Sequence, residues 1–239
     1  MSVLKNTVKD CFQHSCNASS DFRLSHNMSY IYLVILIVVN HGGSCTLQPA
    51  DVPTLWLDMV DPCIKILQGQ VKTEVEAAMT YLAMGAHFAR DTNNRPGFSK
   101  FFFEAANEER EHAIKIIEYL LMRGQLTHDV SKLLKFPLCS LGIHYLSSVT
   151  GLDALTSALN LEAQVTRSIR DIISTCENPK DHKFNDYHLV DYLTGDFLDE
   201  QYKGERDLAG KVSTLGKMMV AHGPLGEFLF DKKLLHGEL

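Results

Sequence analysis

The chain has 239 residues, of which 23 are basic, 29 are acidic and 45% are apolar, and its formal net charge is −6. This length accommodates one large domain or two small ones, and the apolar fraction excludes a chain that is disordered throughout. The negative charge argues against a general nucleic-acid-binding protein, because such proteins are normally basic. Six cysteines are too few for a small disulfide-rich scaffold.

The beginning of the chain has the pattern of a removable leader. Residues 30–39 form an unbroken apolar run, which is shorter than the roughly 20 residues that a membrane-spanning helix needs. Small residues at 42–45 follow it, as they do at a signal-peptide cleavage site. We therefore expect 1–44 to be a leader with a signal peptide, and 45–239 to be a mature domain, free of the membrane, in the secretory pathway or outside the cell. A signal anchor and a buried strand are the alternatives for the apolar run.

Proline divides the rest of the chain, because it lacks an N–H group and clashes with the preceding helical turn. The stretches between these prolines have helical periodicity, and the prolines that separate them are Pro62, Pro96, Pro137, Pro179 and Pro224. The pattern predicts four long helices and a short fifth one, at 59–90, 98–123, 150–176, 183–220 and 225–235. Long helices of about 40 Å favour an all-α four-helix bundle. Short connections make the first pair and the last pair antiparallel, and the long connection between the second and third helices can cross the whole bundle.

Three of the long helices carry a glutamate in the middle of an apolar face. Each residue advances about 100° around a helix, and this rotation places Glu74, Glu109 and Glu162 among apolar side chains. Gln201 lies on the corresponding face of the fourth helix. Glutamate is rarely buried without a partner, because removing its charge from water is costly. One cation shared between the helices would explain all three glutamates.

The second helix adds a histidine to this face. Glu109 and His112 form a Glu-x-x-His pair, which places two ligands on one turn as in the dimetal sites of helical bundles. Oxygen-rich ligation with one imidazole suits iron or manganese better than structural zinc. The fourth helix has no second Glu-x-x-His pair, so one metal position has fewer ligands and should be more labile. Taken singly, these residues also fit structural roles: a solvated pair for Glu109 and His112, an ion-pair partner for Glu162, and core packing for Tyr81.

The pattern resembles ferritin, and more narrowly its heavy-type, iron-oxidising subunit. The resemblance extends over 59–237, and its most specific stretches are 81–84 with Glu74 one heptad earlier, 108–113, 161–162, 200–201 and 227–232. It implies a ferritin-like bundle that assembles into a hollow 24-subunit cage and stores iron as a ferric oxide mineral. The leader and the cysteines resemble those of the secreted ferritins of insects and related animals.

The resemblance also implies a diiron site that oxidises Fe(II) with dioxygen. Glu74, Glu109 and His112 would bind the first iron. Glu109 would bridge to the second iron, which Glu162 would also hold. These four residues are therefore the expected metal ligands, together with a fifth residue from the fourth helix.

That fifth residue is Gln201, which would hydrogen-bond water or dioxygen near the second iron, while Tyr81 would support the site from beside it. Light-type subunits lack the ligands, so the complete set favours an active ferroxidase, in a homo-oligomeric cage or together with a light-type chain. The alternatives are a non-catalytic shell subunit of a mixed cage and a different dimetal bundle oxidase. The single Glu-x-x-His pair and the C-terminal helix disfavour the last alternative.

Some positions depart from the family pattern. Vertebrate heavy subunits line their three-fold pores with two carboxylates three residues apart. Asp191 matches the first of these, but Thr194 replaces the second, so the route of iron entry is open. Among the acidic residues that are linked to mineral nucleation, Glu108 and Glu111 match, while Ile114 replaces a third. Both glutamates are equally suited to a plain helix surface.

Four cysteines follow the expected leader: Cys45, Cys63, Cys139 and Cys176. The secretory pathway permits disulfides. The long crossover makes the third helix antiparallel to the first, so the start of the first helix and the end of the third lie at the same end of the bundle. Cys63 and Cys176 occupy those two positions, and we predict that they form a disulfide. Cys45 fits a bridge to another subunit, and four reduced thiols are the alternative.

Overall fold

Long helices make up nearly all of the chain that the computed structural model describes, which is residues 53–125, 133, 150–177 and 185–238. In chain order these are α3 (Asp61–Ala89), α4 (Pro96–Met122), α5 (Gly151–Glu177), α6 (Tyr187–Tyr192), the π-helical segment η3 (Leu193–Leu198), α7 (Asp199–His222) and α8 (Pro224–Leu235). These residues include no strand, so the all-α fold is confirmed. No helix among them is long and apolar enough to cross a membrane. The expected leader, 1–44 with its apolar run, lies outside the described residues.

Proline explains where three helices begin. α3, α4 and α8 each have a proline at the first or second position, where a missing N–H group breaks no hydrogen bond. The helices predicted at 59–90, 98–123, 150–176 and 225–235 are thus confirmed, with boundaries that differ by one or two residues. The turn expected to include Pro96 and Gly97 is shorter, because both residues belong to α4.

The fourth predicted helix, 183–220, needs correction. It begins at Tyr187, because the Asp186 carboxylate accepts a hydrogen bond from the Leu189 N–H group and so caps the first turn. It is also not a continuous α-helix: α6 passes into the π-helical segment η3 before α7 continues to His222. A π-helical segment adds a residue to the turn, and hydrophobic periodicity at 100° per residue does not indicate one.

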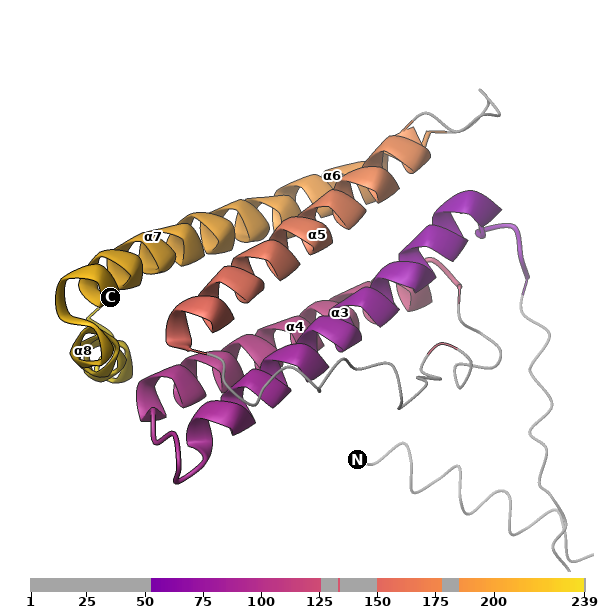
Figure 1. Ribbon diagram of the computed structural model, residues 1–239. Helices are drawn as coiled ribbons and strands as arrows, with labels where there is room; N and C mark the ends of the chain where they lie inside the picture. The colour runs from indigo at the N-terminus through magenta and orange to yellow at the C-terminus, as the bar shows by residue number, and fades with distance from the viewer. Residues whose placement is uncertain (1–52, 126–132, 134–149, 178–184, 239) are drawn as a thin grey trace, which may run out of the picture. The chain divides into compact units, whose positions relative to one another are not determined.

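The disulfide predicted from the topology is present. Cys63 near the start of α3 is bonded to Cys176 near the end of α5, with their Cα atoms 5.6 Å apart. α5 is therefore antiparallel to α3, and both lie side by side in Figure 1. Because α4 follows α3 through a short turn, α4 and α5 run in the same direction, as the predicted long crossover requires. Cys45 and Cys139 lie outside the described residues.

The bundle core consists of two apolar clusters. One surrounds the disulfide and includes Ala77, Ala113 and Val165. The other lies toward α8 and includes Tyr81 and Phe102. The junction between the two clusters falls at mid-helix on α3, α4 and α5, and the polar face residues lie at this junction.

The short helix α8 docks against one end of the bundle through two buried carboxylates (Figure 1). Asp231 accepts hydrogen bonds from the N–H groups of Gly97 and Phe98, at 2.8 and 3.1 Å, at the start of α4. Glu227 accepts one from the Gly151 N–H group at 2.9 Å, at the start of α5. Carboxylates are favourable at helix N-termini, where N–H groups lack partners. A Cβ atom at Gly97 would overlap the Asp231 carbonyl group, so this close approach requires glycine.

Candidate metal centre

The four polar side chains expected on apolar faces are all buried. Glu74 is 0% exposed, Glu109 3% and Glu162 9%. His112 is 6% exposed and lies one turn after Glu109 on α4. The helix-face prediction is therefore confirmed for these residues.

Two helices bring three of these side chains together. Glu74 from α3, with Glu109 and His112 from α4, each offer one ligand atom, and these atoms lie within 4.8 Å of one another. The nearest Glu109 oxygen, Oε2, is 3.6 Å from Nδ1 of His112, which is beyond hydrogen-bonding distance. Such spacing leaves room for an ion that contacts all three groups, since carboxylate and imidazole ligands lie about 2.0–2.6 Å from a divalent metal.

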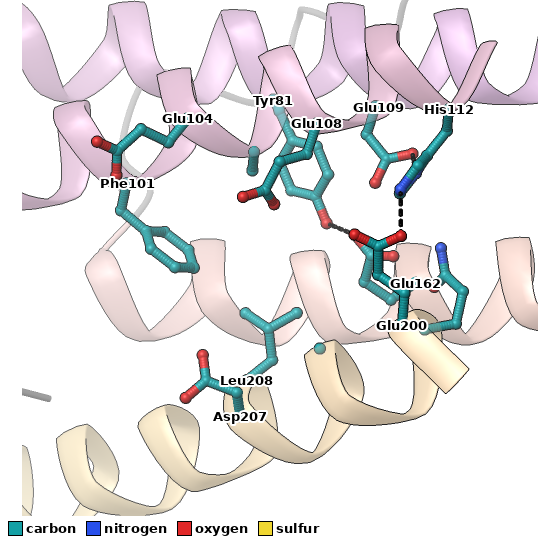
Figure 2. Close-up of a pocket in the computed structure, with 13 residues that line it drawn as sticks. Tyr81, Phe101, Glu104, Glu108, Glu109, His112, Glu162, Glu200, Asp207 and Leu208 are labelled. Carbon is teal, nitrogen blue, oxygen red and sulfur yellow. Dashed lines mark hydrogen bonds and ion pairs between the residues drawn. The ribbon is translucent and has the colours of Figure 1, made fainter. Parts of the chain in front are cut away.

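The other half of the site comes from α5 and α7. The Tyr81 hydroxyl group donates a hydrogen bond to Oε1 of Glu162, as Figure 2 shows. The Gln201 side chain is 4% exposed, and its Oε1 atom accepts a hydrogen bond from the Thr166 hydroxyl group at 3.4 Å. All six residues predicted for the site thus lie in the middle of the bundle.

A cavity of about 210 Å³ opens between α4 and α7 at this point. Five of the predicted site residues line it: Tyr81, Glu109, His112, Glu162 and Gln201. Glu74, which belongs to α3 and is fully buried, does not line the cavity. The rim adds further carboxylates, from Glu104, Glu108, Glu200 and Asp207. Small cations could therefore reach the buried carboxylates through an acidic opening.

Burial raises the pKa of all three carboxyl groups at the site. Burial raises the pKa of Glu74 well above its ordinary value, and the neighbouring Glu109 raises it further. Burial, followed by the charge of Glu162, raises the pKa of Glu109 to about 8. Burial also raises the pKa of Glu162, against the hydrogen bond from Tyr81. A bound cation would favour the ionised forms, because opposite charge stabilises a carboxylate.

Five buried side-chain polar atoms have no hydrogen-bond partner among the described residues, and three of them lie at this site: Oε2 of Glu74, Oε2 of Glu109 and Nδ1 of His112. The other two, Oδ1 of Asn185 and Oδ2 of Asp231, lie elsewhere in the chain. Buried polar atoms are nearly always paired, so unpaired ones require an explanation. The three at this site all belong to the residues whose ligand atoms converge. Two carboxylates and one imidazole suit Fe(II) or Mn(II), so these residues fit the metal that the sequence implies.

Sequence reasoning missed two residues that contact the site, Glu200 and Gln70. Glu200 Oε2 lies 3.4 Å from Nε2 of His112 and 3.3 Å from Nζ of Lys115. Gln70 donates a hydrogen bond to Glu74 at 2.8 Å. Gln70 stands four residues before Glu74, and this spacing was the available signal, but a glutamine at that spacing is common on any helix.

The positions that were compared with the family pattern for iron entry and mineral nucleation are all exposed, both those that match it and the two that depart from it, Thr194 and Ile114. Asp191 lies in α6 and Thr194 in η3, while Glu108, Glu111 and Ile114 lie on α4. Ile114 is 41% exposed, which is high for an isoleucine. Their roles in iron entry and mineral nucleation stay predictions.

Comparisons with known proteins agree with this geometry. The family model described as the ferritin-like domain matches residues 64–218. The chain belongs to the ferritin family. This ferritin is 57% identical over 203 residues to the ferritin heavy chain of Papilio xuthus, covering 85% of this chain and 93% of that one. It is also 57% identical to the ferritin heavy chain of Trichoplusia ni, covering 80% and 88%, and 51% identical to that of Drosophila melanogaster, covering 84% and 96%.

A solved structure is similar as well. The crystal structure of Trichoplusia ni secreted ferritin superimposes on this ferritin with a TM-score of 0.74 at 56% sequence identity, covering 80% of this chain and 97% of that one. The resemblance to heavy-type ferritins of insects is therefore confirmed.

Proposed function

We propose that this ferritin is an iron-storage subunit with ferroxidase activity, which oxidises Fe(II) with dioxygen and deposits ferric mineral inside a multi-subunit cage. The observation that carries the proposal is the convergence of Glu74, Glu109 and His112, each with a buried polar atom that lacks a hydrogen-bond partner within the described part of the chain. The names of the relatives, which are ferritin heavy chains, support it.

The first iron position is formed by Glu74, Glu109 and His112. Glu109 lines the same cavity as Glu162, and the charge of Glu162 contributes to the raised pKa of Glu109. This placement between two carboxylates suits a bridging ligand. Glu162 then holds the second iron, and Gln201 provides a neutral hydrogen-bonding group for water or dioxygen beside it.

The residues perform two tasks in this proposal. They hold two Fe(II) ions side by side, so that each ion gives up one electron and dioxygen accepts both. The three carboxylates favour Fe(III) over Fe(II), because fixed negative charge stabilises the more highly charged ion. Tyr81 favours the ionised form of Glu162, against the effect of burial, and orients it through its hydrogen bond. The product leaves through the acidic opening lined by Glu108 and Glu200.

The proposal includes assembly and location. Trichoplusia ni supplies two of the similar proteins, a secreted ferritin and a ferritin heavy chain. This chain also carries an apolar run at 30–39 of the kind found in signal peptides. We propose that the mature chain, 45–239, forms a 24-subunit cage in the secretory pathway or outside the cell, alone or with a light-type chain.

Stopped-flow absorbance after mixing the purified cage with Fe(II) in air tests the activity. Glu74→Ala and His112→Ala each remove a ligand of the first position, and we expect oxidation to slow by roughly 10²-fold or more, since each change deletes a group needed in the reaction. Glu76→Ala is the matched control, because Glu76 lies on the same helix but faces outward. Equal rates for the wild type and the two ligand variants would instead identify a non-catalytic shell subunit.

A further inference from the structure

A buried glutamine connects the first iron position to the opposite helix. Gln70 on α3 is 1% exposed, and its Nε2 atom donates a hydrogen bond to Oε1 of Glu74 at 2.8 Å. The Ser168 hydroxyl group on α5 donates a hydrogen bond to Oε1 of Gln70 at 2.6 Å. Ser168, Gln70 and Glu74 therefore form a chain of hydrogen bonds from α5, through α3, to the metal centre.

The direction of this chain fixes the glutamine amide. An amide has a donor end and an acceptor end. The Glu74 carboxylate can only accept, so the donor end of the amide faces Glu74 and the acceptor end faces Ser168, whose hydroxyl group donates to it. A flipped amide would place its carbonyl oxygen against the Glu74 carboxylate, where two acceptors repel. The Ser168 hydroxyl group thus satisfies the carbonyl oxygen of Gln70 and restrains the amide in the orientation that faces Glu74.

The two oxygens of the Glu74 carboxylate therefore have different roles. Oε1 is held by Gln70, while Oε2 has no hydrogen-bond partner among the described residues and belongs to the group whose ligand atoms converge. A glutamate that is anchored through one oxygen cannot rotate freely about its last torsion. The other oxygen is then already directed at the cation before the cation arrives.

We propose that Gln70 is a positioning residue for Glu74, and that Ser168 locks Gln70 in the orientation this task requires. The inference rests on the proposed function, because it concerns the same metal centre. Gln70 does not touch the ion and carries no charge. It acts through Glu74, as hydrogen-bond partners behind metal ligands generally do, and loss of such a partner typically lowers metal affinity 10–100-fold.

A purely structural role would give a different result. In that case Gln70 merely satisfies buried polar groups, and its replacement would lower the melting temperature without altering the metal affinity of the folded protein. The two roles are therefore separated by a measurement of binding and coordination, not by a measurement of stability.

The test uses Co(II) in place of Fe(II), so that binding is measured without oxidation of the metal by dioxygen. The visible absorption of bound Co(II) also reports on the geometry of its ligands. Gln70→Met keeps the length and volume of the side chain and removes both hydrogen bonds. We expect the tighter of the two Co(II) affinities in the assembled cage, measured by calorimetry, to fall 10–100-fold, with a changed visible spectrum. Ser168→Ala keeps Gln70 but removes the hydrogen bond to its carbonyl oxygen. We therefore expect a smaller fall in Co(II) affinity at the same position.

Gln164→Met is the matched control, because Gln164 is exposed on α5 and is not among the residues that line the cavity. Co(II) affinity and spectrum equal to the wild type in Gln70→Met would overturn the proposal, even with a lowered melting temperature. Should Gln70→Met not assemble, Ser168→Ala decides alone, and wild-type binding in that variant overturns the proposal. Failure of the proposed function looks different: wild-type protein and His112→Ala would then bind Co(II) equally.

Discussion

The two halves of the candidate metal centre accommodate buried charge in different ways. On α3 and α4, the Glu74 and Glu109 carboxylates and the His112 ring each keep one buried atom without a hydrogen-bond partner among the described residues. On α5 and α7, Glu162 already accepts the Tyr81 hydrogen bond, and Gln201 carries no charge. The first half therefore has the stronger need for a cation. The second half is partly satisfied without one. Both of its residues line the cavity, whereas the first half includes Glu74, which does not.

This difference has a functional meaning within the proposal. An ion in the first half replaces interactions that the protein lacks, whereas an ion in the second half competes with an existing hydrogen bond. We therefore expect two unequal affinities, with the weaker position beside the acidic opening. A labile position at the opening suits a site through which iron passes toward storage.

The largest effect is expected where the two halves meet. Glu109 lies beside Glu74 and His112 and also lines the cavity together with Glu162. Glu109→Ala should weaken both Co(II) positions and slow Fe(II) oxidation by roughly 10²–10³-fold, because a shared ligand is lost from both ions. Calorimetry and stopped-flow absorbance measure the two effects. The outward-facing Glu118→Ala on α4 is the control, and a loss confined to one position would show that Glu109 belongs to one half only.

The next effect is a pH dependence of the metal-free cage. Burial and the charge of Glu162 raise the pKa of Glu109 to about 8, whereas an unfolded glutamate titrates near 4.3. Between these values the folded state holds a proton that the unfolded state has released. The free energy of unfolding therefore falls as pH rises, by about 1.4 kcal/mol per pH unit for this one proton, which is tenfold in the unfolding equilibrium.

Denaturant unfolding of chelator-treated protein at several values between about pH 5 and 8 checks this slope. Glu109→Gln should remove its share of the slope and be more stable than the wild type near pH 8, because an amide stays neutral. Glu162→Gln should do less, since Tyr81 already favours the ionised form of Glu162. A larger gain from Glu162→Gln than from Glu109→Gln would reverse the comparison of the two halves.

A smaller effect is expected from the tyrosine. Tyr81→Phe deletes the hydroxyl group that donates to Glu162 and should cost about 1–3 kcal/mol of stability, since the acceptor carries charge. Co(II) affinity should change several-fold at the weaker position and stay unchanged at the tighter one. Tyr202→Phe, on the exposed face of α7, is the control. A shift at the tighter position would mean that Tyr81 supports the whole centre.

The same comparison shows what the sequence can reveal. Rotation about a helix axis placed Glu74, Glu109, His112 and Glu162 on buried faces, since burial of a helix face depends mainly on angle. The Cys63–Cys176 disulfide followed from topology, which depends on helix order and connection length. Both kinds of information are present in the spacing of residues along the chain.

Contacts between helices were harder to predict. The hydrogen bond between Ser168 and Gln70, and the contact of 3.4 Å between Glu200 and His112, depend on distances across the bundle. Hydrophobic periodicity fixes the angle of a side chain but not the axial offset of its neighbour on another helix. The π-helical segment η3 was missed for a related reason, because a local change in turn size leaves the apolar pattern nearly intact.

The smallest effect is expected at the threonine of the second half. Thr166 stands four residues after Glu162, much as Gln70 stands four residues before Glu74, and its hydroxyl group donates to Gln201 at 3.4 Å. That distance is at the long limit for a hydrogen bond. Thr166→Val keeps the shape of the side chain and removes the donor, so we expect at most about a twofold fall in Co(II) affinity at the weaker position.

Thr156→Val on the exposed face of α5 is the matched control, because the Thr156 hydroxyl group bonds only a main-chain carbonyl group of its own helix. The informative quantity is the ratio between the two supporting residues. If the first half of the site binds its ion more tightly, Gln70→Met must lower the Co(II) affinity more than Thr166→Val does. An equal or larger fall in Co(II) affinity for Thr166→Val would mean that the position beside the cavity is the more rigid of the two. Iron would then be retained at that position, where we expect it to be released toward storage.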